Sequence, residues 1–223
     1  MKSPSSRVAS WIAVAVALVA PACLSAAEIW RVDNLQKFGT RAVVVEGAPR
    51  VQDFPGGKAV VFDGVRDGLF VTGIPIAGAE QYTIEVLFMP AEGGLAEQRF
   101  VHLQDTNMSR ALLETRLNGK GGWWLDTFIN TPPDERGLTL IDPTRVHPTG
   151  KWHWAALRYD GKIMSHFVNG QKEREGEFHY RPFADGTVSL GVRQNKVFWF
   201  KGAIREVRFH REALPEAKLQ KVQ

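Results

Sequence analysis

The sequence predicts an all-β protein that folds as two antiparallel sheets packed face to face. Apolar runs of a few residues, several alternating with polar residues, recur along the chain and read as strands. Turn residues such as Gly, Asn, Asp and Pro separate these runs at short intervals. Two tight-turn signals, Asp160-Gly161 and Asn169-Gly170, border the clearest pair of runs. Together these observations are typical of a β-sandwich.

The stretch from Gly150 to Gly170 predicts a hairpin of two strands, Trp152–Tyr159 and Ile163–Val168. Glycine in the Asp-Gly turn supplies the positive φ that a tight connection needs. Neither face of the first strand is plainly polar, so we expect a sheet that is covered on one side and forms a groove on the other. One face carries His153, Ala155, Leu157 and Tyr159, and the other carries Trp152, Trp154, Ala156 and Arg158.

The remaining segments predict further strands with turns between them. The β-branched run over 42–45 predicts a buried strand, residues 171–178 predict an exposed strand or loop, and Leu214–Val222 predicts a short terminal helix. The other predicted strands cover residues 28–35, 41–46, 58–62, 69–71, 82–89, 99–104, 111–117, 123–130, 138–141, 187–192, 197–200 and 203–210.

Residues 1–27 predict a secretory signal peptide. Lys2 and Arg7 form a basic start, the apolar run that follows is too short for a comfortable membrane span, and Ser25-Ala26-Ala27 fits a cleavage site. Cleavage would leave residues 28–223 as one domain, secreted or periplasmic and not transmembrane. A lipoprotein anchored at Cys23 is the alternative, although the preceding Ala20-Pro21-Ala22 argues against it.

Removal of this segment changes the charge and cysteine inventory. Lys2 and Arg7 leave with it, so the 28 basic residues fall to 26 against 24 acidic ones, and the single Cys is lost. A near-neutral domain without a long basic run gives no reason to expect nucleic acid as a partner. Without cysteine, disulfides, thiol nucleophiles and thiolate metal sites are excluded from residues 28–223.

The sequence resembles laminin-G-like domains, which have the concanavalin A-like jelly-roll fold. The resemblance covers roughly residues 55–215 and implies a two-sheet jelly roll with one concave sheet. It rests on Gly150-x-Trp152-His153 with Tyr159-Asp160-Gly161 and Phe167-Val168-Asn169-Gly170, on the strand pair Val60–Gly64 and Gly68–Val71, and on the closing strand Phe200–Leu214. The same fold hosts many functions, so the site must carry any functional claim.

Strand alternation predicts one face rich in rings and charges, which the resemblance identifies as the concave face. It would carry Glu85, His102, Gln104, Glu114, Arg116, Trp124, Asp126, Trp154 and Arg158. Aromatic rings stack on the apolar face of a sugar, while carboxylates and guanidinium groups bind its hydroxyls. A cross-strand charge ladder on a solvated face is the alternative. The predicted ligand-binding residues are Glu114, Arg116, Trp124, Asp126, Trp154 and Arg158.

Catalysis has no motif to support it. Catalytic relatives in the concanavalin A-like superfamily carry Glu-x-Asp-x-x-Glu on one strand, whereas Glu85 and Glu114 stand alone on theirs. Ser165 and His166 are adjacent on a strand, so they point to opposite faces and cannot form a nucleophile–base pair.

Calcium is the one metal that the resemblance suggests, and no cofactor is required. The six histidines are scattered without ligand spacing. Asp63 and Asp67 are the candidate calcium ligands, because many laminin-G-like domains bind this ion through oxygen. Relatives usually carry Asp in the closing strand where this chain has Arg205, which argues against the ion, and turn chemistry is the alternative role of Asp63-Gly64.

The leading interpretation is a secreted, non-catalytic carbohydrate-binding module. The alternatives are a protein–protein adhesion or assembly module, with an extracellular protein instead of a glycan as partner, and a divergent glycan-cleaving enzyme.

Overall fold

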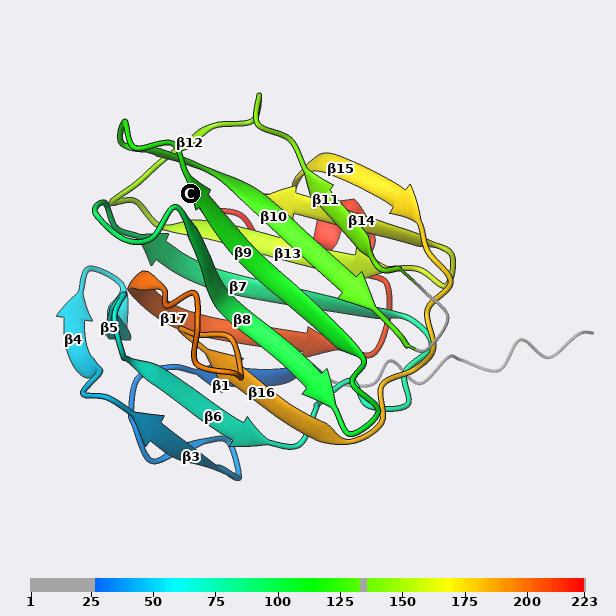
Figure 1. Cartoon of the computed structure of the whole chain (residues 1–223), viewed down its shortest axis with the longest axis horizontal. Coiled ribbons are helices and arrows are strands. Elements are labelled where there is room, and N and C mark those ends of the chain that lie inside the picture. The colour runs from blue at the N-terminus through cyan, green and yellow to red at the C-terminus, as the bar shows by residue number, and fades with distance from the viewer. Residues whose placement is uncertain (1–26, 133–135, 223) are drawn as a thin grey trace, which may run out of the picture.

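Two antiparallel sheets stack to form the protein, which confirms the predicted sandwich (Figure 1). The computed structural model describes residues 27–132 and 136–222. The predicted signal peptide and Cys23 therefore lie outside the described residues, apart from Ala27. Among the described residues, no helix has the length and hydropathy needed to cross a bilayer.

The nine-stranded sheet lies in front in Figure 1. Its order is β11, β10, β9, β8, β16, β6, β3 and β2, with β12 paired to β10. Its strands are β2 (Lys37–Phe38), β3 (Arg41–Glu46), β6 (Gly68–Thr72), β8 (Glu97–Asp105), β9 (Arg110–Leu117), β10 (Gly122–Asn130), β11 (Leu138–Ile141), β12 (His147–Pro148) and β16 (Gly186–Leu190).

The eight-stranded sheet lies behind it. Its order is β15, β14, β13, β7, β17, β5 and β4, with β1 paired to β17. Its strands are β1 (Glu28–Arg31), β4 (Arg50–Phe54), β5 (Gly57–Asp63), β7 (Tyr82–Pro90), β13 (His153–Tyr159), β14 (Ile163–Val168), β15 (Gln171–Glu177) and β17 (Lys201–His210).

The core fills the space between the sheets with aromatic and aliphatic side chains. Phe88 of β7 stacks on Phe100 of β8 with ring centroids 4.1 Å apart, so it joins the two layers. Trp123 of β10 packs edge-on against Phe88 at 5.1 Å and is fully buried. Its neighbour Trp124 points to the outer face and is partly exposed, as strand alternation predicts.

Several predicted elements differ from the structure. Residues 41–46 form a strand, but Val44 is 65% exposed, because β3 lies towards the sheet edge beside the two-residue β2. Residues 197–200 are loop, and β4 was not predicted. The predicted terminal helix is a single 3₁₀ turn over Glu216–Lys218.

The hairpin of β13 and β14 is confirmed, but its predicted open groove is wrong. Leu214 and Leu219 from the C-terminal segment pack against Ala156 and Phe167 on its outer face, and all four side chains are buried. The backbone N–H of Leu214 also donates to the Thr83 hydroxyl at 2.9 Å. The outer face of the eight-stranded sheet is therefore sealed at this point.

Candidate functional site

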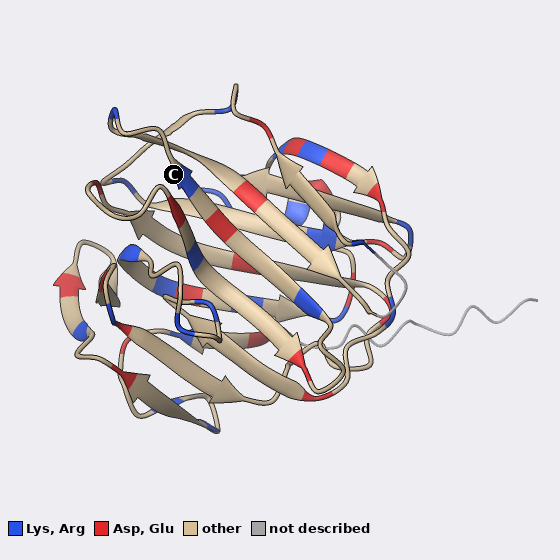
Figure 2. Cartoon of the chain, in the orientation of Figure 1, with Lys and Arg blue, Asp and Glu red and all other residues tan. Residues whose placement is uncertain are grey.

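The outer face of the nine-stranded sheet carries a row of paired charges on β8, β9 and β10. Register places Glu114 directly between Arg99 of β8 and Asp126 of β10, while Arg116 lies opposite Trp124. Figure 2 shows the acidic and basic segments side by side on these strands. Alternation along each strand keeps the charged side chains on one face.

These side chains form a continuous ion-pair network. The Arg116 guanidinium contacts Asp126 Oδ2 through Nη2 at 2.6 Å and through Nε at 2.7 Å. Arg99 Nη2 lies 3.1 Å from Glu114 Oε2. The two oxygens of Glu97 bridge Arg99 and Arg116. Each guanidinium is therefore held in a defined orientation by more than one acidic side chain.

Burial shifts the two central carboxyl groups. Glu114 is 3% exposed and Asp126 is 1% exposed. Burial, followed by the charge of Asp126, raises the pKa of Glu114 to about 8, despite the opposing charges of Arg99 and Arg116. Burial also raises the pKa of Asp126, against the opposing effect of Arg116. Glu114 is therefore largely protonated at neutral pH.

Replacing Glu114 by Gln should remove a decline in stability at alkaline pH. The pKa of Glu114 is about 8 in the folded state against 4.5 normally, so its stabilising contribution is full below pH 4.5 and is lost as pH rises through 8. We expect the parent to lose about 1 kcal/mol more than Glu114→Gln between pH 7 and pH 8. Urea unfolding at both pH values measures this.

The two buried histidines His102 and His166 do not contribute to the change in unfolding free energy between pH 7 and pH 8. Burial lowers the pKa of His102 to about 3 and that of His166 to about 4, so both are already neutral above pH 7. These histidines lower the free energy of unfolding only as pH falls below 6.5, whereas Glu114 lowers it as pH rises towards 8. Parallel curves for the parent and Glu114→Gln between pH 7 and pH 8 would contradict the raised pKa.

A hollow of about 160 Å³ opens over this network. Two of its arginines face rings, with Arg110 5.4 Å from the Phe128 centroid and Arg99 3.9 Å from that of Phe198. The hollow is lined by Arg99, Arg110, Leu112, Glu114, Arg116, Asp126, Phe128, Thr139 and Arg193.

The loop over residues 191–200 brings Arg193 to this hollow and places the Phe198 ring against Arg99. The backbone N–H of Gln194 donates to Nδ1 of the fully buried His102 at 3.0 Å, so the neutral ring carries its proton on Nε2. Lys196 and Phe198 have φ of 59°, which side chains of this size rarely adopt. The loop is thus held in a specific conformation against β8.

The structure brings together four of the six predicted binding residues and separates two. Glu114, Arg116, Trp124 and Asp126 share the outer face of β9 and β10. Trp154 and Arg158 do not join them, because β13 belongs to the other sheet. Alternation along a strand shows which residues share a face of that strand, but not which sheet the strand joins.

Trp154 and Arg158 instead pack against other residues on the outer face of the eight-stranded sheet. Trp154 is 7% exposed beneath the Arg208 guanidinium, 4.9 Å from its ring centroid. Arg158 Nη1 donates to the carbonyl of Leu214 at 3.3 Å. Glu85 accepts the backbone N–H of Gln220 at 2.7 Å on the same outer face. We therefore exclude Trp154 and Arg158 from the candidate site.

Sequence reasoning missed several lining residues. Arg110 and Phe128 have the same strand parity as Glu114 and Asp126, so alternation alone could have placed them on this face. Arg99 is harder to place, because the register of β8 shifts between Arg99 and Val101. Arg193 comes from a loop, for which alternation has no meaning.

The predicted calcium ligands act as turn residues in this structure. Asp63 Oδ1 accepts the backbone N–H groups of Val65, Arg66 and Asp67 at 2.8 to 3.1 Å. Asp67 accepts N–H groups of Ala48 and Asp63 through its two oxygens. Across residues 27–132 and 136–222, no group of three or more His, Cys, Asp or Glu side chains could hold a metal ion.

Arg205 makes no ion pair with Asp63 or Glu206 in the part of the chain that the structure describes; Asp63 lies beside Arg66 and Glu206 beside Arg208. Its guanidinium lies 4.1 Å from the centroid of Trp152 and donates to the Pro55 carbonyl at 3.0 Å. Its role is to pack the edge of the sandwich.

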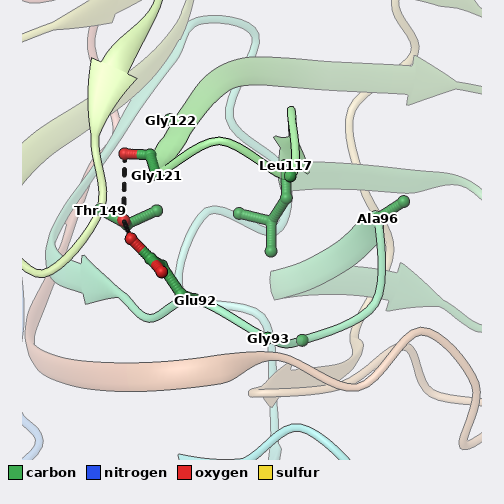
Figure 3. Close-up of a pocket in the computed structure, with 9 residues that line it drawn as sticks. Glu92, Gly93, Ala96, Leu117, Gly121, Gly122 and Thr149 are labelled. Atoms are coloured by element: carbon green, nitrogen blue, oxygen red, sulfur yellow. Dashed lines mark hydrogen bonds between the residues drawn. The ribbon is translucent and has the colours of Figure 1, made fainter.

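A second cleft lies where the β7–β8 loop, the β9–β10 turn and Thr149 meet (Figure 3). Its volume is about 270 Å³, and glycines make up much of its wall. The Thr149 hydroxyl donates towards the Gly121 carbonyl at 3.1 Å and towards Glu92 Oε1 at 3.3 Å. Among the described residues that line this cleft, Glu92 carries the one charged side chain.

Comparison with known families identifies the fold. Residues 63–220 match a family model of laminin G type described as the concanavalin A-like lectin/glucanases superfamily. The chain belongs to this superfamily. The predicted resemblance is therefore confirmed over most of this concanavalin A-like domain, and a search of curated proteins found no match.

Solved structures share the fold at low sequence identity. Domain 4 of AbnA, a GH43 extracellular arabinanase from Geobacillus stearothermophilus solved with arabinotriose, is 19% identical with a TM-score of 0.53, covering 87% of this chain and 86% of that one. The receptor-binding domain of botulinum neurotoxin C/D mosaic serotype is 14% identical with a TM-score of 0.64; the match covers 85% of this chain but only 48% of that one.

A third structure is the CBM40 of the Ruminococcus gnavus IT-sialidase, bound to α2,6 sialyllactose. It is 22% identical with a TM-score of 0.50, and the match covers 67% of this chain and 95% of that one. The concanavalin A-like domain therefore resembles carbohydrate-binding domains in fold. At these identities the likeness does not extend to site residues.

The Glu114–Asp126 pair has one property of an acid–base pair, since one carboxyl is largely protonated at neutral pH. However, Asp126 Oδ2 is held twice by Arg116, and both carboxyl groups are almost fully buried. A carboxylate held this way is well placed to orient a guanidinium and poorly placed to attack a sugar.

Proposed function

We propose that this concanavalin A-like domain binds carbohydrate on the outer face of its nine-stranded sheet, in the hollow over β8, β9 and β10. The observation that carries the proposal is the combination of oriented guanidinium groups around one open hollow with the partly exposed Trp124 ring beside it. Sugars are recognised by this combination, because rings contact their C–H faces and planar polar groups bind their hydroxyls.

The ion-pair network supports the proposal physically. Glu97 and Asp126 hold Arg116, and Glu97 and the Glu114 carboxyl group hold Arg99, so little side-chain freedom remains to be lost when a ligand binds. Trp124 extends the face beyond the hollow, since it lies opposite Arg116 and is partly exposed. Its indole offers a platform for a further sugar ring.

The comparisons support the same function at the level of the fold. The arabinanase domain was solved with arabinotriose and the CBM40 with sialyllactose. The arabinanase is extracellular, which is consistent with the export expected from residues 1–27. Non-catalytic recognition of a glycan by an exported domain is our proposal for this chain.

Replacing Trp124 by Ala is expected to weaken glycan binding about tenfold, which corresponds to about 1.4 kcal/mol of lost ring contact. The domain should remain folded, because the side chain is partly exposed. A glycan array identifies the bound sugar, and calorimetry on that sugar measures the change.

Trp152→Ala is the matched control, since Trp152 packs on Phe54 and Arg205 away from the proposed face. It should leave affinity unchanged. Equal affinity of Trp124→Ala and the parent would remove Trp124 from the site. An array without any retained sugar, together with recovery of a protein partner, would favour the adhesion or assembly module instead.

A further inference from the structure

The hollow over β8, β9 and β10 has an excess of positive charge. Four arginines line it against two carboxyl groups. Arg99 and Arg116 are engaged with Glu97, Glu114 and Asp126 in the ion-pair network. The other two arginines remain to be explained.

Arg110 and Arg193 make no ion pair with any acid of the described residues. Arg110 Nε is buried and has no hydrogen-bond partner there. Burial, followed by the charge of Arg193, lowers the pKa of Arg110, so the two cations repel one another across the hollow. An unpaired, partly desolvated cation is costly unless an anion compensates for it.

The acids of the network do not supply that compensation. Glu114 raises the pKa of Arg110, but only as the third and smallest cause, and Glu114 is itself largely protonated at neutral pH because its pKa is about 8. Leu112 lies between Arg110 and Glu114 on the outer face of β9, where strand alternation gives the three residues a common side. Among residues 27–132 and 136–222, no acid therefore compensates for the charge at this end of the hollow.

We propose that Arg110 and Arg193 bind the carboxylate of an acidic sugar, so that the ligand of this face is an anionic glycan. The inference rests on the proposed function and narrows the ligand to one chemical class, glycans that carry a carboxylate. A guanidinium donates two parallel hydrogen bonds to a planar carboxylate, and Arg110 is further fixed by its position over the Phe128 ring.

The test compares oligogalacturonate with its methyl ester, which has the same sugar chain without the charge. Calorimetry at low salt should show at least tenfold tighter binding of the free acid, and the preference should shrink as salt is added. In the double variant Arg110→Met with Arg193→Met, the ratio of the two affinities should fall towards one. Its melting temperature should stay close to that of the parent, because no ion pair is lost and the removed repulsion offsets the lost contact between Arg110 and the Phe128 ring.

Arg66→Met is the matched control, since the Arg66 side chain is 73% exposed in a loop outside the hollow. It should keep the parent's preference. Equal binding of acid and ester by the parent would overturn the inference and leave the proposed function standing. Failure of any glycan, neutral or acidic, to bind would overturn both. Tighter binding of sulfated than of unsulfated chondroitin, without a preference for oligogalacturonate over its ester, would overturn the carboxylate assignment.

Discussion

Ending the chain at His210 is expected to lower the free energy of unfolding by about 3–6 kcal/mol. This deletion removes Leu214 and Leu219, which bury the outer face of Ala156 and Phe167. Full burial of one leucine contributes about 1.5–3 kcal/mol. It also removes the backbone N–H of Gln220 that binds Glu85, a carboxyl group only 1% exposed. Urea unfolding of both proteins measures the loss.

A chain that ends at Gln220 is the control, because it keeps both leucines and the hydrogen bond to Glu85. Its stability should equal that of the parent within about 0.5 kcal/mol. If ending the chain at His210 costs no more than this control, the C-terminal segment does not seal the eight-stranded sheet. In that case Trp154 and Arg158 would have to be reconsidered as an open surface.

Replacing Arg116 by Met is expected to destabilise the domain by about 2–4 kcal/mol. Asp126 would lose both of its short contacts while remaining in a site where it is 1% exposed. Breaking a buried ion pair from one side costs about 3–5 kcal/mol, and the partial exposure of Arg116 reduces that figure. Denaturant unfolding at pH 7 measures the change.

A second substitution separates lost packing from an uncompensated charge. Asp126→Asn in the Arg116→Met background removes the isolated carboxylate and should restore about half of the lost stability. The double-mutant cycle gives the coupling between the two residues. A double variant no more stable than Arg116→Met alone would show that the ion pair is not what holds this face.

Turn residues and strand alternation predicted much of the fold, because turns and single strands depend mainly on neighbouring residues in the sequence. The Asp160-Gly161 turn and the alternation on either side define β13 and β14, and the structure has both. The run over 42–45 was wrongly predicted to be buried. β-branched residues favour strands at the edge of a sheet as well as in its centre, and β3 lies towards an edge where Val44 is exposed. The positive φ of Phe198 could not be foreseen, since it depends on the loop packing against β8.

The part of the candidate site on the β9–β10 hairpin was predictable from the sequence, and the rest was not. Glu114, Arg116 and Asp126 lie on neighbouring strands joined by a short turn, so a hairpin model alone brings them together. Trp154 and Arg158 satisfied the same alternation, but strand order is set by packing across the whole sandwich. Arg193 reaches the hollow from a loop whose path no periodicity describes.

The central claim is that glycan binds over β8, β9 and β10, and mapping by NMR tests it most directly. Titration of ¹⁵N-labelled protein with the glycan retained on the array should shift the Trp124 indole and the backbone signals around Arg99, Arg110 and Arg116. Signals of the sealed β13–β14 face should stay fixed. Shifts confined to the cleft beside Glu92 and Thr149, with none on β9 or β10, would contradict the account.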